Sequence, residues 1–146
     1  MAAKDKYHQE ARRSLEKDGW SVTHDPYFIV SEGVNFPVDL AAERIIAAEK
    51  GNEKIAVEVK SFLRESLVNE FHQALGQYLD YEIGLEEQEP DRQIVLAVTA
   101  EVFDKITKIP LLMRALDKFR VSVMVFDHKN EVIIQWIKKQ PNTTKS

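Results

Sequence analysis

The segment from Ile55 to Val98 constrains the fold of this chain most, because it has the pattern of a strand, a long helix and a second strand. Ile55 to Lys60 carries β-branched side chains at alternate positions, which predicts a strand. Apolar residues then recur at helical spacing from Ser66 to Glu87, and Pro90 follows. Arg92 to Val98 is a nearly continuous apolar run, typical of a strand covered on both faces. A long helix is the connection that parallel strands need, so we expect a parallel crossover.

The remaining pattern places this crossover inside a larger sheet. We expect a first helix from Asp5 to Asp18 and two short helices between Ala100 and Phe119. The other expected strands are Trp20 to His24, Pro26 to Val30, Phe36 to Glu49, Val121 to Phe126 and Val132 to Ile137. This order favours an α/β fold with a central mixed β-sheet flanked by α-helices. We expect one domain over residues 1–139 and a disordered C-terminal tail over residues 140–146.

Composition excludes several classes of protein. The 146 residues include no cysteine, which excludes disulfide frameworks, thiolate metal sites and thiol nucleophiles. No stretch approaches the ~20 apolar residues that span a bilayer, and charged residues follow the first methionine closely, so we expect a soluble, cytoplasmic protein with no membrane contact. The formal net charge is −4, whereas proteins that bind nucleic acid through bulk charge are usually basic. A cation site would neutralise part of this acidic excess.

The residues that indicate chemistry are Asp39, Glu58 and Lys60. Because side chains alternate along a strand, Glu58 and Lys60 share one face with their Cα atoms ~7 Å apart. A hairpin turn expected at Gly51-Asn52 can return Glu58 to the neighbourhood of Asp39. Two carboxylates and one main-chain carbonyl suit Mg²⁺, and a lysine can hold an attacking water or neutralise a phosphorane. The structural alternative is a solvent-facing salt pair between Glu58 and Lys60, since short motifs recur by chance.

Longer strings of the sequence resemble the XisH family, and the similarity runs from about Ala3 to Ile137. The strings are Ala3-Lys4-Asp5, Asp18-Gly19-Trp20, His24-Asp25-Pro26, Pro37 to Leu40, Glu43-Arg44, Ala47 to Gly51, Ile55 to Phe62, Gln73 to Tyr78 and Leu85 to Arg92. The family is known as the fdxN element excision controlling factor. It is associated with cyanobacteria and accompanies a site-specific recombinase during programmed DNA excision. The resemblance implies a restriction-endonuclease-like core with the metal-site pattern of PD-(D/E)XK nucleases.

The resemblance also implies a set of site residues. They are Asp39, Glu58, Lys60, Gln77 and Glu10. The first two would bind Mg²⁺ or Mn²⁺ together with the main-chain carbonyl of Val59, while Gln77 would contact phosphate or water and Glu10 would be a supporting acid on the first helix. The implied activity is Mg²⁺-dependent phosphodiester hydrolysis on DNA. The implied partners are DNA, a site-specific recombinase or another excision-controlling protein, and a second copy in a homodimer, because one site cuts one strand.

Two other functions compete with this one. A non-catalytic regulatory or interaction protein would keep the fold and bind a recombinase, a partner protein or DNA; the acidic charge favours it. A nuclease that acts on RNA could use the same site. The four histidines lack metal-ligand spacing, and we expect His8 and His72 to be surface or helix-packing residues. We expect Trp20 and Trp136 to lie in the core or an interface.

Overall fold

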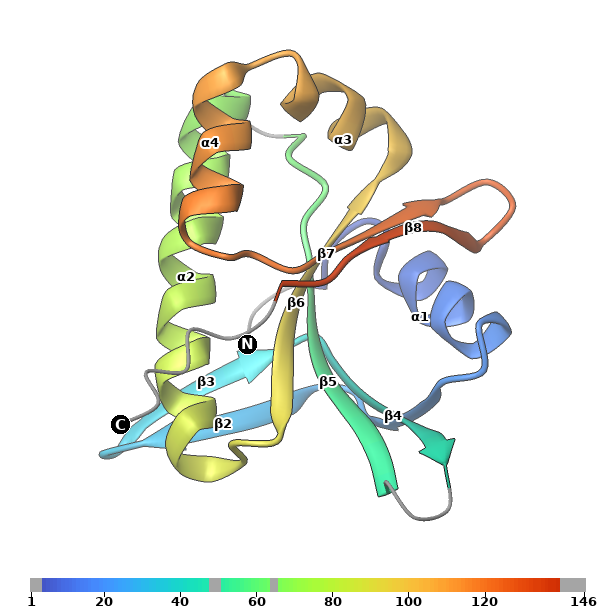
Figure 1. The fold of residues 1–146 in the computed structure, drawn as a ribbon, viewed down its shortest axis with the longest axis vertical. Coiled ribbons are helices and arrows are strands. Elements are labelled where there is room, and N and C mark those ends of the chain that lie inside the picture. The colour runs from blue at the N-terminus through green and yellow to red at the C-terminus, as the bar shows by residue number, and fades with distance from the viewer. Residues whose placement is uncertain (1–3, 48–50, 64–65, 140–146) are drawn as a thin grey trace.

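Six strands form the central sheet (Figure 1). In spatial order they are β1 (Ser21–His24), β4 (Leu40–Ala47), β5 (Gly51–Val59), β6 (Arg92–Thr99), β7 (Val123–Asp127) and β8 (Val132–Ile137). The pairs β5–β6 and β6–β7 are parallel and the other three are antiparallel, so the sheet is mixed, as predicted. The structure is a computed structural model that describes residues 4–47, 51–63 and 66–139. The tail predicted over residues 140–146 lies outside these ranges.

The parallel crossover has the form that the sequence predicts. Helix α2 (Leu67–Gln88) connects β5 to β6, and the side chain of Ser66 accepts a hydrogen bond from the amide of Asn69 at 3.1 Å, which caps the helix. Thr99 caps α3 (Ala100–Thr107) in the same way, and α4 (Pro110–Lys118) follows. Within the described ranges, no helix is long and apolar enough to cross a membrane.

Alternate side chains of β5 enter two different cores. Ile55, Val57 and Val59 are buried in a cluster that includes residues of α1 (His8–Lys17) and Trp20. Ala56 belongs to the other cluster, on the side of α2. Burying an aliphatic side chain of this size contributes roughly 1.5–3 kcal/mol, so both faces fix the register of β5. Glu58 therefore projects toward α2, and the predicted alternation is confirmed.

A separate two-stranded hairpin was not predicted. The segment from Phe36 to Glu49 is mostly extended as far as Ala47, as predicted, but it forms two strands that divide at Asp39; residues 48 and 49 lie outside the described ranges. Before Asp39, β3 (Val34–Val38) pairs with β2 (Tyr27–Ser31); after it, β4 pairs with β5. The amide of Asp39 donates to a side chain, as described below, instead of continuing a strand ladder. The division places Asp39 at the corner between the two sheets.

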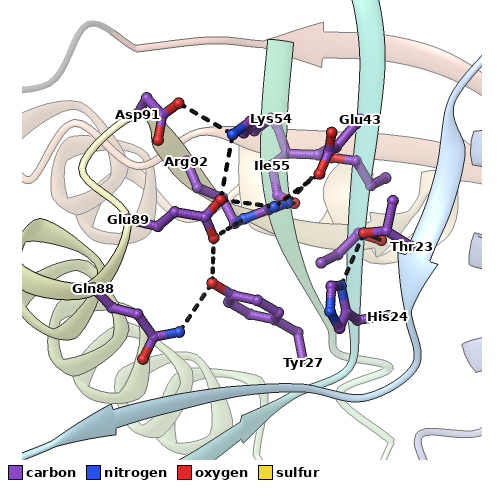
Figure 2. A network of polar contacts seen from close by, with 12 residues as sticks. Thr23, His24, Tyr27, Glu43, Lys54, Ile55, Gln88, Glu89, Asp91 and Arg92 are labelled. Atoms are coloured by element: carbon purple, nitrogen blue, oxygen red, sulfur yellow. Dashed lines mark hydrogen bonds and ion pairs between the residues drawn. The ribbon is translucent and has the colours of Figure 1, made fainter. Parts of the chain in front are cut away.

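Arg92 joins the hairpin, the sheet and the end of α2 (Figure 2). Its side chain is 2% exposed, and its guanidinium donates to the Glu89 carboxylate at 2.8 Å and to the Ile55 carbonyl at 2.9 Å. The third guanidinium nitrogen, Nη2, donates to Glu43 at 3.2 Å, and the hydroxyl of Tyr27 donates to Glu89. Arg92 above all, with Tyr27 and the charge of Lys54, lowers the pKa of Glu89 to about 2 against the opposing effect of burial. A buried arginine with this many acceptors fixes how β2 approaches the sheet.

Candidate functional site

The structure brings Asp39, Glu58 and Lys60 together at the carboxyl end of β5. The amide of Val59 donates to Asp39 Oδ2 at 2.7 Å, and the amide of Asp39 donates to Glu58 Oε1 at 3.3 Å. Lys60 Nζ lies 3.5 Å from Glu58 Oε2. The two carboxylates are thus neighbours on one side of the sheet, and main-chain amides hold them there.

Glu58 occupies a poorly solvated position for a carboxylate. Its residue is 9% exposed, and the hydroxyl of Tyr81 on α2 donates to its Oε2 at 3.3 Å. Burial and the nearby charge of Asp39 raise the pKa of Glu58 to about 8, although Lys60 acts in the opposite direction. Burial, together with the charge of Glu58, also raises the pKa of Tyr81. A positive charge close to both carboxylates would favour their ionised forms.

A histidine that the sequence reasoning set aside contacts this site. His8 is 3% exposed, and its Nδ1 lies 3.7 Å from Asp39 Oδ1. Its Nε2 lies 2.7 Å from Asp25 Oδ1, while Arg12 donates to the other oxygen of Asp25 at 2.8 Å. Asp39 and Asp25 raise the pKa of His8 against the opposing effect of its burial. The sequence predicted that His8 is a surface or helix-packing residue; its burial contradicts the surface alternative, and neither alternative includes its contacts with these two carboxylates.

Asp5 ties the start of the chain to the segment that follows Lys60. Its carboxylate accepts from the amide of Ser61 at 2.8 Å and from the amide of Tyr7 at 2.9 Å. The first turn of α1 is therefore attached to the site through Asp5 as well as through His8. Lys60 itself donates its main-chain amide to the carbonyl of Ala97 at 3.0 Å, so the lysine stays in register with β6.

Glu10 and Gln77 do not join this group. Glu10 is half-buried on α1, and its carbonyl accepts from the hydroxyl of Ser14 at 2.7 Å. Gln77 is exposed on α2. Among the described residues, no hydrogen bond or ion pair connects either one to Asp39, Glu58 or Lys60. Their assigned roles stay predictions.

The donors at the site fit a hard divalent cation better than a soft one. Across the described ranges, no group of three histidine, aspartate or glutamate side chains is gathered as a metal site. A cation bound here would have Asp39 and Glu58 as its two carboxylate ligands. Mg²⁺ binds few protein ligands and keeps several waters, so two carboxylates and the Val59 carbonyl suffice. The raised pKa of Glu58 agrees with this fit, because neutralising the mutual repulsion of the two acids would stabilise both ionised forms.

Comparison with known proteins extends over nearly the whole chain. The sequence matches the family described as XisH protein over residues 1–134. A solved structure of an XisH family protein from Nostoc punctiforme PCC 73102 shares 41% identity and a TM-score of 0.83, over 92% of this chain and 100% of that one. A solved structure of an fdxN element excision controlling factor protein from Anabaena variabilis shares 41% identity and a TM-score of 0.81, over 90% of this chain and 98% of that one. No curated protein matches the sequence.

Proposed function

This chain belongs to the XisH family, and from that premise and its paired carboxylates we propose that it controls DNA element excision as a Mg²⁺- or Mn²⁺-dependent phosphodiester hydrolase. The proposed partners are DNA, a site-specific recombinase or another excision-controlling protein, and a second copy of the chain. The name of the Anabaena variabilis relative supports the role in excision. The chemistry rests on the residues at the end of β5.

One observation carries the proposal: main-chain amides hold Asp39 and Glu58 against each other beside Lys60. A bound cation would lower the pKa of a water and neutralise charge on the scissile phosphate. Asp39 and Glu58 would bind that cation, and their burial would strengthen its attraction. Lys60, which Glu58 orients, would hold a water or a phosphate oxygen at the site through its ammonium group.

A cleavage assay tests this proposal directly. Supercoiled, nicked and branched DNA are incubated with the protein and Mg²⁺ or Mn²⁺. We expect the wild type to cut and Lys60→Ala to lose at least ~100-fold of the rate, since removing a group that stabilises transition-state charge has an effect of this size. Lys108→Ala is the matched control, because Lys108 is an exposed lysine at the C-terminal end of α3 and its ammonium group lies 3.1 Å from the exposed carboxylate of Asp104. Equal cleavage by the wild type and Lys60→Ala would show that the activity comes from a contaminant.

A non-catalytic regulatory function is the second candidate. The net charge of −4 and the lack of a third clustered acid among the described residues favour it. Such a protein would bind DNA or a recombinase without cutting. Wild-type protein that binds Mg²⁺, shifts DNA or recombinase in a binding assay, and leaves every DNA substrate intact would support this function over the hydrolase.

A further inference from the structure

A hollow between the β2–β3 hairpin and α2 lies outside the candidate cation site. It has a volume of about 230 Å³ and lies where the hairpin packs beside the C-terminal half of the helix (Figure 1). Its lining residues include Glu32, Val34, Phe36, Asp80, Ile83 and Gly84. Val34 is 50% exposed and Ile83 is 59% exposed, so large apolar side chains from both walls are open to solvent here. Exposed apolar side chains that gather in a concave surface are typical of a binding site.

The walls of this hollow are held in place by the fold. The hairpin turns through Glu32 and Gly33, whose φ angles are 48° and 81°, and a two-residue turn with both φ angles positive suits the twist of paired strands. The side-chain amide of Gln88 donates to the carbonyl of Phe28 at 3.0 Å and accepts from the amide of Val30 at 2.8 Å. These two bonds attach β2 to the end of α2. A ligand would therefore bind to a preformed surface.

The charged residues that line the hollow are both acidic. Glu32 and Asp80 are exposed, and neither forms an ion pair within the described ranges. The sequence has no lysine or arginine from residue 18 to 43, which includes the hairpin, or from residue 65 to 91, which includes α2. Apolar walls with an acidic rim complement a ligand that has both an aliphatic part and a positive charge.

We propose that this hollow binds an arginine side chain of a partner protein. The aliphatic stem of that arginine packs on Val34, Phe36 and Ile83, and its guanidinium pairs with Glu32 and Asp80 at the rim. Arginine suits such a site better than lysine, because a guanidinium is more weakly hydrated than an ammonium group and leaves water more readily. The inference concerns a protein partner, so it goes beyond the proposed hydrolase and does not depend on it.

The charges of the hollow disfavour two other occupants. DNA would bring its phosphates against Glu32 and Asp80, and like charges repel. A second copy of the chain, docked hollow to hollow about a two-fold axis, would place the acids of one copy against the same acids of the other. An arginine on a different polypeptide avoids both repulsions.

Nuclear magnetic resonance of the ¹⁵N-labelled full chain in EDTA tests this inference. The probe is the peptide acetyl-Ala-Val-Arg-Val-Ala-amide, whose one charge is on the arginine. We expect the amide signals of Val34, Ile83 and Gly84 to shift during the titration. The same peptide with neutral citrulline in place of arginine should bind ~10–100-fold more weakly, because it loses the charge-assisted hydrogen bonds to the carboxylates. The lysine peptide should have an intermediate affinity.

Two double variants separate the hollow from the general acidic charge of the chain. Glu32→Gln with Asp80→Asn removes two charges at the rim and should weaken binding of the arginine peptide ~10–100-fold. Glu101→Gln with Asp104→Asn removes the same charge from exposed positions of α3 and should change binding by less than ~2-fold, because salt screens distant charges. Ile83→Ala, which shortens one apolar wall, should weaken binding ~3–10-fold.

Several results would overturn the inference. Equal binding of the arginine and citrulline peptides would do so, and so would an equal loss in the two double variants, which would indicate general attraction to an acidic protein. Unchanged signals of Val34, Ile83 and Gly84 at millimolar arginine peptide would exclude the site. Shifts of these signals with protein concentration alone would assign the hollow to a second copy instead. The samples contain neither divalent cations nor DNA, so none of these outcomes bears on the proposed hydrolase.

Discussion

Glu58 belongs to the proposed cation site, and its ionised form lowers the stability of the folded protein. A buried carboxylate next to another acid is unfavourable when ionised, and this is why its pKa rises to about 8 from an ordinary value of 4.5. The raised pKa means that the folded protein binds this proton more tightly than the unfolded chain does. The contribution of Glu58 to stability is complete below pH 4.5 and is lost as the pH rises toward 8.

Replacing Glu58 with its neutral isostere should therefore stabilise the protein in alkaline solution. We expect Glu58→Gln to raise the free energy of unfolding by roughly 2–4 kcal/mol at pH 8 in the presence of EDTA, and to change it little at pH 5. Urea denaturation at the two pH values measures this difference. Glu86→Gln, at an exposed position of α2, is the control and should change the free energy of unfolding by less than ~0.5 kcal/mol at either pH. An equal effect of Glu58→Gln at both pH values would contradict the assigned burial.

Some residues of the site could be predicted from the sequence and others could not. Asp39, Glu58 and Lys60 could be selected because strand alternation and a family pattern point to them. His8 precedes the buried Ala11 by three positions, a spacing that places both on one helix face and could have identified it as buried. Its contact with Asp39 depends on the packing of α1 against the corner of two sheets, which no local pattern encodes.

At the scale of elements, the hairpin and α2 meet closely at Gly84. A Cβ atom at this position would fall well inside contact distance of Ile29 Cγ2, and Ile29 is fully buried in β2. By contrast, a Cβ atom at Gly76 of the same helix would meet nothing within 4 Å. Packing against Ile29 therefore requires glycine at position 84, whereas the space around position 76 would admit a larger side chain.

This contrast predicts opposite effects of the same substitution. Gly76→Ala should stabilise the protein by roughly 0.5–1 kcal/mol, because alanine has the higher helix propensity. Gly84→Ala should destabilise it by about 1–3 kcal/mol, because overpacking against Ile29 outweighs that gain. Thermal or urea denaturation of the two variants measures both effects. Stabilisation by Gly84→Ala would mean that β2 does not pack on α2 as described.

The sequence predicts some elements much better than others. The crossover from β5 through α2 to β6 could be predicted, because two apolar strands joined by a long periodic helix can pair in few topologies. The division at Asp39 was not, because the residues on both sides of it favour extended backbone. The change of partner from β2 to β5 depends on contacts far apart in sequence, such as the amide of Asp39 with Glu58.

At the scale of the whole molecule, stability should pass through a maximum near pH 5. Glu89, with its pKa lowered to about 2 by Arg92, contributes stability that is present above pH 4.5 and is lost as the pH falls toward 2. Glu58 and His8, with raised pKa values, contribute stability that is lost as the pH rises. Melting temperatures measured from pH 2 to pH 9 in EDTA should fall on both sides of this maximum. A flat profile between pH 5 and pH 8 would contradict the raised pKa of Glu58.

Arg92 should matter to the whole molecule more than any exposed arginine. We expect Arg92→Met to cost about 3–5 kcal/mol, because it leaves Glu89, Glu43 and main-chain carbonyls without their buried donor. Arg114→Met, at an exposed position of α4, should change the free energy of unfolding by less than ~0.5 kcal/mol. Urea denaturation of both variants makes the comparison. Similar losses in the two would show that the guanidinium of Arg92 is dispensable.

The placement of β5 has a consequence for how a ligand would meet the protein. This strand is hydrogen-bonded to a neighbour on each side and covered by a core on each face, so its amide protons should exchange with deuterium only when the molecule unfolds globally. Glu58 is the penultimate residue of β5, and the carboxylate of Asp39 accepts from the amide of the last one, Val59. An ion or phosphate would therefore bind to a rigid, preformed surface, and the protein would lose little conformational entropy on binding.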